Sequence, residues 1–288
     1  MDLVTFLIQL LNGLQYGLLL FLVASGLTLI FGIMGIINLA HGSFYMIGAY
    51  LAFSLSTLTG NLFTAILLGI VLSAVLGIIL EWLLISRLYH RDHLEQVLLT
   101  YGLILIFEAL RSILVGDDVH SIAIPAILNH SIPLTDTLSY PVYRIFISMV
   151  CLILAGLMYG VIQRTRLGMM IRAGASNREM VQSLGINIQL VYRLVFAMGF
   201  TLAAFAGMLA APISSVYPGM GDQVLIICFV VVVIGGIGSV WGALVAALLI
   251  GLVDTFSKVF FPELAGITVY LLMAMVLLWR PEGLFRMT

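Results

Sequence analysis

The chain has 288 residues, of which 62% are hydrophobic and only 9% are charged, and its mean hydropathy is +1.21. A soluble domain of this size carries about a quarter charged residues, so the composition excludes a water-soluble globular protein and indicates a polytopic membrane protein. The formal net charge of −1 identifies no partner, because the placement of charge matters more than its sum in a membrane protein.

The first apolar segment covers residues 3–33. A single helix of that length extends roughly 46 Å and exceeds the ~30 Å hydrocarbon core of a bilayer, so the segment must tilt, protrude or break. The sequence GIMGIINLAHG at residues 32–42 predicts the break, because Gly lowers helix propensity. No basic residue precedes Arg87, so the segment lacks the positive region of a signal peptide and we expect it to remain as a membrane span.

Apolar spans and polar loops then alternate along the chain. Spans are expected at residues 43–58, 62–86 and 97–115. Residues 87–96 are charged, which predicts a cytosolic loop. Residues 116–142 contain no Lys or Arg but carry Asp117, Asp118 and Asp136, which predicts an extracytoplasmic loop.

Four further apolar segments follow, at residues 143–162, 194–216, 224–253 and 266–279. The third is too long for one comfortable span and is broken by GGIGS at 235–239, so it either returns as a hairpin or enters and leaves on one side. The preceding loops place the N-terminus outside if the first three segments each cross once. The side of residues 254–265, which hold the only lysine, Lys258, is weakly determined, whereas Arg280 and Arg286 predict a cytosolic C-terminus.

These segments predict one all-α integral membrane domain over residues 1–288, a polytopic bundle of about eight or nine transmembrane helices with Gly-rich interrupted helices. The two interruptions resemble each other, since Gly35 and Gly42 are seven residues apart, as are Gly235 and Gly242. Transporters often contain internal repeats with interrupted helices near the pathway. Membrane helices also use Gly simply for close packing, and the sequence leaves both interpretations open.

The stretch at about 163–193 is the most basic part of the chain and predicts a cytosolic loop. It contains five of the twelve basic residues and one acid, Glu179. Its arginines are Arg164, Arg166, Arg172, Arg178 and Arg193.

A short helix is expected within this basic loop. Ser176 and Glu179 have the spacing of a capping box, in which each side chain binds the other residue's backbone N–H at a helix start. The helix should run from about Asn177 to Leu184 and end at Gly185. Met180, Val181 and Leu184 then fall on one face, spaced to dock into a groove of a partner.

No catalytic or metal site is expected in this chain. A phosphate-binding loop requires Gly-Lys-Ser/Thr, and the only lysine lies in the sequence Ser257-Lys258-Val259. His90 and His93, with Asp92 and Glu95, have no second ligand cluster and indicate a solvated loop. Cys151 and Cys228 lie in apolar runs and indicate neither a disulfide nor a metal site.

Five polar or charged positions at membrane depth are notable. Asn38 and His41 could line a translocation pathway, but hydrogen bonds to the backbone freed at the first break are the favoured interpretation. Glu108 and Arg111 are three residues apart on one helix face and are expected to form an ion pair. Glu81 is expected to behave similarly near the opposite surface.

Three separated motifs resemble the membrane permease of bacterial branched-chain amino acid ABC importers, in the expected order. They are GLTLIFGIMGIINLAHGSFYMIGAY (26–50), TRLGMMIRAGASNREMVQSLGIN (165–187) and FVVVVIGGIGSVWGA (229–243), followed by the closing RPEGLF (280–285). The likeness covers essentially the whole chain. It carries over to Asn38, His41, Gly42 and Gly48 in the early motif, and to Arg166, Gly168, Arg172, Asn177 and Gly185 in the loop similar to the family's ATPase-contacting loop.

The resemblance implies a multi-pass permease of the bacterial inner membrane that is not itself an enzyme. It implies two partner ATPase subunits that bind ATP and Mg, so that this chain holds no cofactor, and a second, homologous permease in a heterodimer. An extracytoplasmic binding protein would deliver the substrate, and we expect it to contact residues 116–142. Membrane lipid is the other expected partner, and nucleic acid is not one.

Three alternatives remain at this stage. Similar permeases carry urea or short amides instead of amino acids. A secondary transporter or channel that acts alone would need titratable residues deep in the membrane, and the sequence offers few beyond Glu108 and His41. A structural membrane subunit would have no pathway at all.

Overall fold

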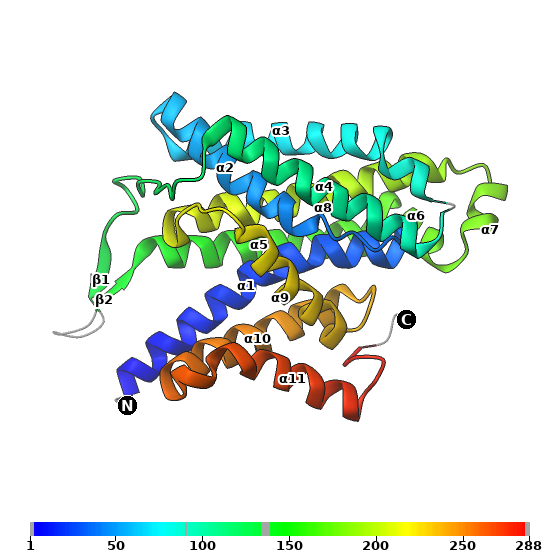
Figure 1. Ribbon diagram of the computed structural model, residues 1–288. Coiled ribbons are helices and arrows are strands. Elements are labelled where there is room, and N and C mark those ends of the chain that lie inside the picture. The colour runs from blue at the N-terminus through cyan, green and yellow to red at the C-terminus, as the bar shows by residue number, and fades with distance from the viewer. Residues whose placement is uncertain (1–2, 90, 134–138, 286–288) are drawn as a thin grey trace.

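The computed structural model describes residues 3–89, 91–133 and 139–285, and it shows an elongated bundle of α-helices (Figure 1). His90, Asp136 and Arg286, which entered the predictions above, lie outside the described residues. The α-helices are α1 (Leu3–Met34), α2 (His41–Thr59), α3 (Leu62–Leu83), α4 (His93–Val115), α5 (Val142–Arg164), α6 (Arg166–Ser176), α7 (Arg178–Ser183), α8 (Ile188–Ser214), α9 (Met220–Gly235), α10 (Val240–Phe260) and α11 (Ala265–Trp279). Two 3-10 turns, η1 (Ile85–Leu88) and η2 (Pro262–Leu264), and two short strands, β1 (Ser131–Pro133) and β2 (Ser139–Pro141), complete the described structure.

The predicted all-α membrane fold is confirmed. Within the described residues, seven helical segments are long and apolar enough to cross a membrane, namely α1, α3, α4, α5, α8, α10 and Pro262–Trp279. The shorter α9 and the more polar α2 pack among them, α2 against α3, α8 and α9, and α9 against α1 and α10.

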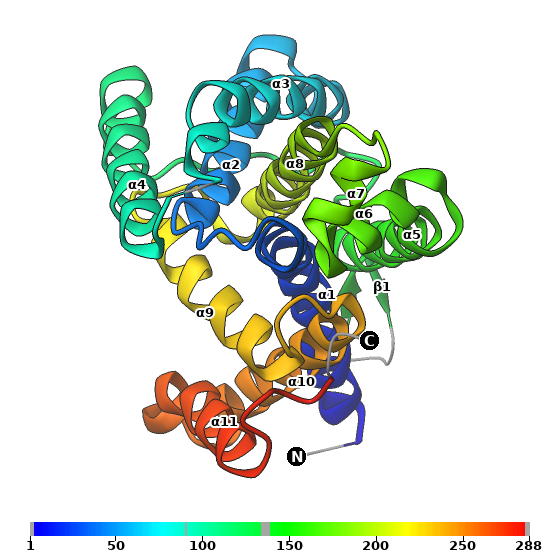
Figure 2. The ribbon, with the colours of Figure 1, turned by 90° about the vertical axis from the view of Figure 1, so that its right-hand side faces the viewer.

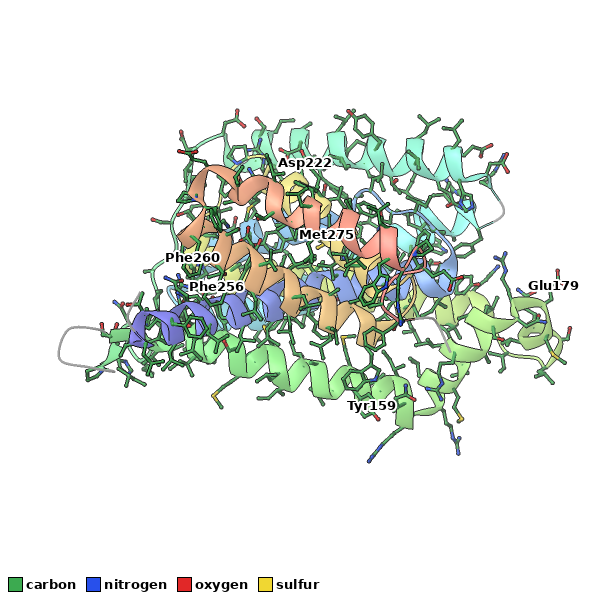
Figure 3. All side chains as sticks on the ribbon, turned by 90° about the horizontal axis from the view of Figure 1, so that it is seen from below. Tyr159, Glu179, Asp222, Phe256, Phe260 and Met275 are labelled. Carbon is green, nitrogen blue, oxygen red and sulfur yellow. The ribbon has the colours of Figure 1, made fainter. Side chains whose placement is uncertain are left out.

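The first helix, α1, forms the centre of the bundle (Figure 2). It packs against α10, α8, α5 and α9, and nearly every residue from Gly17 to Ile30 is buried. Helices α3, α4, α5 and α11 instead expose large apolar side chains such as Leu114, Leu157 and Met275, and Met275 lies on the outer side of α11 (Figure 3). Apolar surface of this extent suits contact with lipid rather than water.

The two ends of the bundle carry different connections (Figure 1). The hairpin end contains the first residues of α1, the α2–α3 turn, the described residues between α4 and α5, and the α10–α11 turn. There β1 pairs antiparallel with β2 and Ile132 faces Tyr140, while a bridge between His120 and Val216 holds the connection against the end of α8. The α7 end contains η1, α6, α7 and the C-terminal segment.

Both Gly-rich breaks exist, but the first begins later than expected. Helix α1 continues to Met34, and Gly35 then leaves the helix with φ +65°. Gly32 remains helical because it packs against the second break: a Cβ on Gly32 would lie 2.6 Å from Cα of Gly238. The breaks are therefore in contact, which supports the close-packing role of their glycines, and an internal repeat stays a prediction.

The C-terminal segment covers the second break. The backbone N–H groups of Leu284 and Phe285 donate hydrogen bonds to the carbonyls of Ile234 and Gly235, at 2.8 and 3.2 Å. These carbonyls belong to the last turn of α9, where a helix leaves acceptors without intrahelical partners. Leu284 and Phe285 thus complete the hydrogen bonding at the end of an interrupted membrane helix.

One predicted loop is largely helical. Residues 254–265 were expected to connect two spans, but α10 continues to Phe260, and only the residues after it form a turn with η2. The reason is local: Asp254 and Lys258 lie one turn apart and form an ion pair at 2.6 Å, so both charges are satisfied within the helix.

Candidate functional site

The basic stretch folds into the two short helices α6 and α7, each with its own N-cap. The Thr165 hydroxyl accepts a hydrogen bond from the N–H of Gly168 at 3.2 Å, and Asn177 Oδ1 accepts one from the N–H of Met180 at 3.0 Å. The predicted capping box was wrong, because Ser176 is the last residue of α6 and Asn177 is the cap of α7. Asn caps a helix about as well as Ser, so the short helix itself forms as expected.

Gly185 ends this helix as the sequence predicted. It lies just after the C-cap residue Leu184 and has φ +82°, a left-handed conformation that Gly adopts without steric cost.

The three apolar side chains of the α7 segment do not share one face. Val181 is 3% exposed and belongs to the hydrophobic core, whereas Met180 and Leu184 are 64% and 74% exposed. Residues 180 and 184 are four apart and align along a helix, while residue 181 lies about 100° around it. The face expected from sequence therefore consists of Met180 and Leu184, with Val181 as the anchor beneath them. Glu179, on the same helix, lies at the far tip of the molecule (Figure 3).

The other predicted loop residues differ in their surroundings. Arg166 is exposed, and Gly168 packs against the carbonyls of Val161 and Ile162, where a Cβ would clash. The guanidinium of Arg172 donates a hydrogen bond to the carbonyl of Ile162 at the end of α5. Gly168 and Arg172 thus hold α6 against α5, and Arg166 is left at the surface.

A buried ion pair lies beneath α7. Glu81, on α3, is fully buried, and its Oε2 accepts a hydrogen bond from Arg193 Nε, on α8, at 2.7 Å. The Tyr89 hydroxyl donates to the other carboxylate oxygen. Burial, and next the hydrogen bond to the Glu81 carboxylate, raise the pKa of Tyr89 far above its ordinary value, so its hydroxyl keeps its proton.

Arg178 connects α7 to this ion pair. Its Nη2 donates to the carbonyl of Tyr89 at 3.3 Å, and its guanidinium lies 5.8 Å from the centre of the Tyr192 ring. We call Glu81, Tyr89, Arg178, Tyr192 and Arg193 the inner cluster. Sequence reasoning expected Glu81 to pair locally, as Glu108 does, but Arg193 is 112 residues away and no local pattern indicates it.

Asn38 and His41 lie inside the bundle, fully buried. Asn38 Oδ1 accepts a hydrogen bond from the N–H of Ala40 at 3.1 Å, and His41 Nε2 lies 2.9 Å from the carbonyl of Val23. A carbonyl can only accept, so Nε2 carries the hydrogen. The Asn38 contact is a backbone hydrogen bond within the first break, as favoured from the sequence, whereas His41 binds a carbonyl inside α1 and outside the break. Asn38 Nδ2 and His41 Nδ1 have no partner within the described residues.

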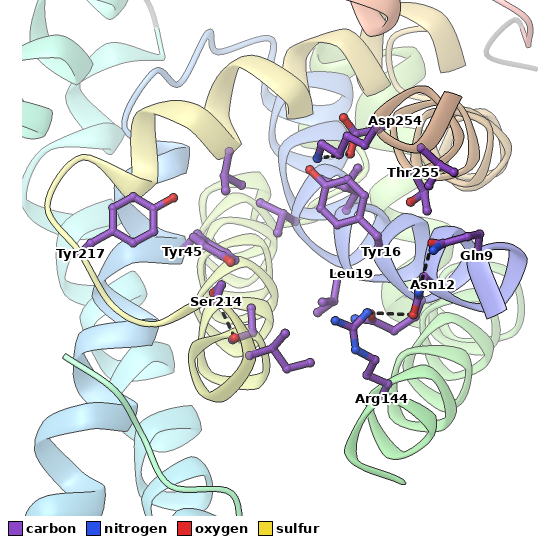
Figure 4. A pocket seen from close by; sticks show the side chains of 18 residues that line it. Gln9, Asn12, Tyr16, Leu19, Tyr45, Arg144, Ser214, Tyr217, Asp254 and Thr255 are labelled. Carbon is purple, nitrogen blue, oxygen red and sulfur yellow. Dashed lines mark hydrogen bonds and ion pairs between the residues drawn. The ribbon is translucent and has the colours of Figure 1, made fainter. Parts of the chain in front are cut away.

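A cavity of about 560 Å³ lies between α1, α2, α5, α8, α9 and α10 (Figure 4). It is lined by residues from the hairpin-end parts of these helices and extends inward to Val23 and Tyr45. We call it the hairpin-end cavity and these two residues its floor. His41 contacts the floor through the Val23 carbonyl, and neither Asn38 nor His41 lines the cavity.

The polar groups of the cavity lie nearer its hairpin end. Arg144 Nη1 donates to Asn12 Oδ1 at 2.9 Å, and Asn12 Nδ2 donates to Gln9 Oε1 at 3.3 Å (Figure 4). Asp254 pairs with Lys258, whose ammonium lies 5.7 Å from the centre of the Tyr16 ring. Sequence reasoning missed this site. The available signal was the row of polar residues three or four positions apart in an otherwise apolar first segment.

The predicted pair of Glu108 and Arg111 is confirmed at 2.9 Å. Arg111 also binds Asp117 at 2.9 Å, and this hydrogen bond holds the pKa of the exposed Asp117 carboxyl below its usual range. These charges satisfy one another at the end of α4 and therefore serve the structure.

The described residues contain no group of three or more side chains that could hold a metal ion. Of the predicted solvated cluster, His93 is described and its Nδ1 lies 3.4 Å from Gln96 Oε1. Cys151 and Cys228 are buried and unpaired.

Comparisons with known proteins cover nearly the whole chain. Residues 9–277 match the family model described as branched-chain amino acid transport system / permease component. The high-affinity branched-chain amino acid transport system permease protein BraD of Pseudomonas aeruginosa is 32% identical over 296 residues, which are 97% of this chain and 95% of that protein. The corresponding protein LivH of Escherichia coli K12 is 29% identical with the same coverage, and LivM of that strain is 28% identical over 91% of this chain and 67% of its own length. No solved structure matches the chain.

Proposed function

Because this chain belongs to the branched-chain amino acid permease family and is the permease subunit of an ABC importer, we propose that it moves branched-chain or related amino acids across the bacterial inner membrane by alternating access, driven by partner ATPases. The observation that carries this proposal is the α7 helix, which exposes Met180 and Leu184 at the tip of the bundle. Exposed apolar side chains at i and i+4 are the anchors by which a short helix docks into a groove.

The contacts of α7 support a mechanical role. Val181 anchors the helix in the core, and Arg178 connects it to Tyr89. Through the inner cluster this connection reaches α3 at Glu81 and α8 at Arg193. A force applied to Met180 and Leu184 by an ATPase would thus act on two membrane helices at once.

The hairpin-end cavity supports alternating access. It ends at Val23 and Tyr45, and behind this floor Phe44 packs against Phe196 and Phe200, with ring centroids 5.7 and 4.2 Å apart. The described structure is thus hollow toward the hairpin end and packed toward the α7 end. A conformation with this arrangement admits substrate from one side, and ATP-driven movement of α7 would open the other.

The partners that the family implies fit this arrangement. We expect two ATPase subunits, which bind ATP and Mg, at the α7 end in the cytosol, together with the C-terminus. A second permease subunit would complete the membrane passage. A substrate-binding protein would contact residues 116–142 at the hairpin end, on the extracytoplasmic side.

The docking role is tested by Met180→Asp combined with Leu184→Asp. Because both side chains are exposed, the variant should fold, but charges in the apolar contact should abolish most ATP-driven uptake into vesicles and most co-purification of the ATPases. Met169→Asp is the matched control, since Met169 is a 55% exposed methionine on the neighbouring α6. Normal uptake with normal ATPase co-purification in the double variant would refute the docking role.

A further inference from the structure

We propose that the hairpin-end cavity is a binding site for a free α-amino acid with an apolar side chain, in which Arg144 binds the carboxylate, Asp254 binds the ammonium and the side chain points inward to the floor. This inference rests on the proposed function and adds to it the ligand's chemical class, its orientation and the residues that recognise it.

The first observation is the polarity of the cavity along its depth. Its hairpin-end part is lined by Gln9, Asn12, Arg144 and Asp254, whereas the part near the floor is lined by Leu20, Val23 and Tyr45, of which only the Tyr45 hydroxyl is polar. Ligand pockets of about 300–1,000 Å³ are apolar with a few polar groups that fix orientation, and this cavity fits that description. A molecule with one charged end and one aliphatic end matches the gradient in a single orientation.

The second observation is that the charged guanidinium of Arg144 binds a neutral partner. Its guanidinium is half-buried and binds the neutral amide of Asn12, and no ion pair of Arg144 occurs within the described part of the chain. A guanidinium has five N–H donors, so four remain for a planar acceptor such as a carboxylate. In a partly dehydrated cavity this charge attracts an anion more strongly than in water.

The third observation is the place of Asp254 relative to Arg144. Arg144 binds Asn12, and Asp254 is tied through Lys258 to the ring of Tyr16. Residues 12 and 16 are one turn apart on α1, about 6 Å along its axis. The cation and the anion thus flank neighbouring turns of one helix, and Figure 4 shows both beside the same cavity.

The charges of the cavity discriminate between substrate classes. A carboxylate accepts several hydrogen bonds, so Asp254 can bind both Lys258 and a ligand ammonium. An α-amino acid carries its carboxylate and ammonium on one carbon and uses both partners. Urea and short amides carry neither charge, so they would accept only neutral hydrogen bonds from Arg144 and gain no charge–charge attraction.

The test uses the permease complex purified from its own membranes into lipid nanodiscs, without the binding protein. Saturation-transfer difference NMR measures the binding of three probes: leucine, leucinamide, which lacks the carboxylate, and 4-methylpentanoate, which lacks the ammonium. We expect the methyl protons of leucine to be saturated more strongly than its α-proton, because the side chain lies deeper. Arg144→Gln should weaken the binding of leucine and 4-methylpentanoate roughly tenfold or more and leave the affinity for leucinamide nearly unchanged.

Asp254→Asn provides the complementary measurement. It should weaken the binding of leucine and leucinamide and leave the affinity for 4-methylpentanoate unchanged. Arg144→Lys should restore part of the affinity for leucine that Arg144→Gln removes. Asp118→Asn is the matched control, because Asp118 is an exposed carboxylate at the hairpin end that does not line the cavity; it should change none of the three affinities.

Five results would overturn the inference. Equal weakening of the binding of all three probes would mean that the variants disturb the cavity without removing specific contacts, and unchanged affinities would mean that these residues do not contact the ligand. Stronger saturation of the α-proton would reverse the orientation. A complex that takes up leucine in sealed vesicles with its binding protein, but shows no saturation transfer in nanodiscs, would refute this site and leave the proposed function standing. A complex that takes up no amino acid in those vesicles would refute both.

Discussion

Two arginines near opposite ends of the bundle differ in the charge of the side chain that each one binds. Arg193, in the inner cluster, binds the fully buried Glu81, which also accepts the Tyr89 hydroxyl. Arg144, at the hairpin-end cavity, binds only the neutral side chain of Asn12 among the interactions of the described residues. A charge held by an opposite charge stabilises the fold, whereas a charge held by a neutral amide remains available to a ligand. Under the two proposals above, the difference separates the part of the protein that would transmit force from the part that would contact substrate.

The largest expected effect concerns the sides of the membrane that the two ends face. A cysteine at Gln182, on α7, should not react with a membrane-impermeant reagent in intact cells, and a cysteine at Asp118 should react fully. Both positions are exposed, and the native Cys151 and Cys228 are buried, so they contribute little background. Labelling at Gln182 but not at Asp118 would reverse the topology and place α7 away from any cytosolic ATPase.

The next effect concerns the stability of the inner cluster. Arg193→Ala leaves the Glu81 carboxylate buried without its cation, which should cost about 3–5 kcal/mol in the free energy of unfolding. The measurement is thermal unfolding of the purified protein, followed by size-exclusion chromatography after heating. Glu81→Gln combined with Arg193→Gln removes both charges and should recover much of the loss; equal instability of the double variant would contradict the ion-pair explanation.

The smallest expected effect is the loss of stability when Arg144 is replaced. Arg144→Gln removes one hydrogen bond to Asn12 and no ion pair, so it should lower the free energy of unfolding by only about 1 kcal/mol. The same heating assay compares it directly with Arg193→Ala. A loss as large as that of Arg193→Ala would show that Arg144 is a structural residue and would weaken the case for a ligand at the cavity.

The membrane architecture could be predicted from the sequence because each of its signals is local. Apolar length identified the spans, Arg content distinguished the loops at the two ends, and Gly-rich stretches identified both interruptions. The ion pair of Glu108 and Arg111 was found for the same reason, since its members are three residues apart. Signals of this kind need no knowledge of which helices are neighbours.

The candidate site could not be predicted in the same way, because it depends on which helices meet. Glu81 and Arg193 belong to α3 and α8, and the cavity combines six helices. The prediction that Val181 lies on the exposed docking face was also wrong. An apolar residue on a short helix can pack into the core or bind a partner, and only the packing of α7 on the bundle distinguishes the two. The cap was assigned to Ser176 instead of Asn177 because two good capping residues are adjacent in the sequence.

The hydrogen bonds of Leu284 and Phe285 to the end of α9 have a consequence for folding during synthesis. The residues whose carbonyls they bind, Ile234 and Gly235, are translated fifty residues earlier. Until the chain has been synthesised past Phe285, these carbonyls at the end of α9 lack that partner. The α9–α10 break therefore completes its hydrogen bonding only after α10 and α11 have been made.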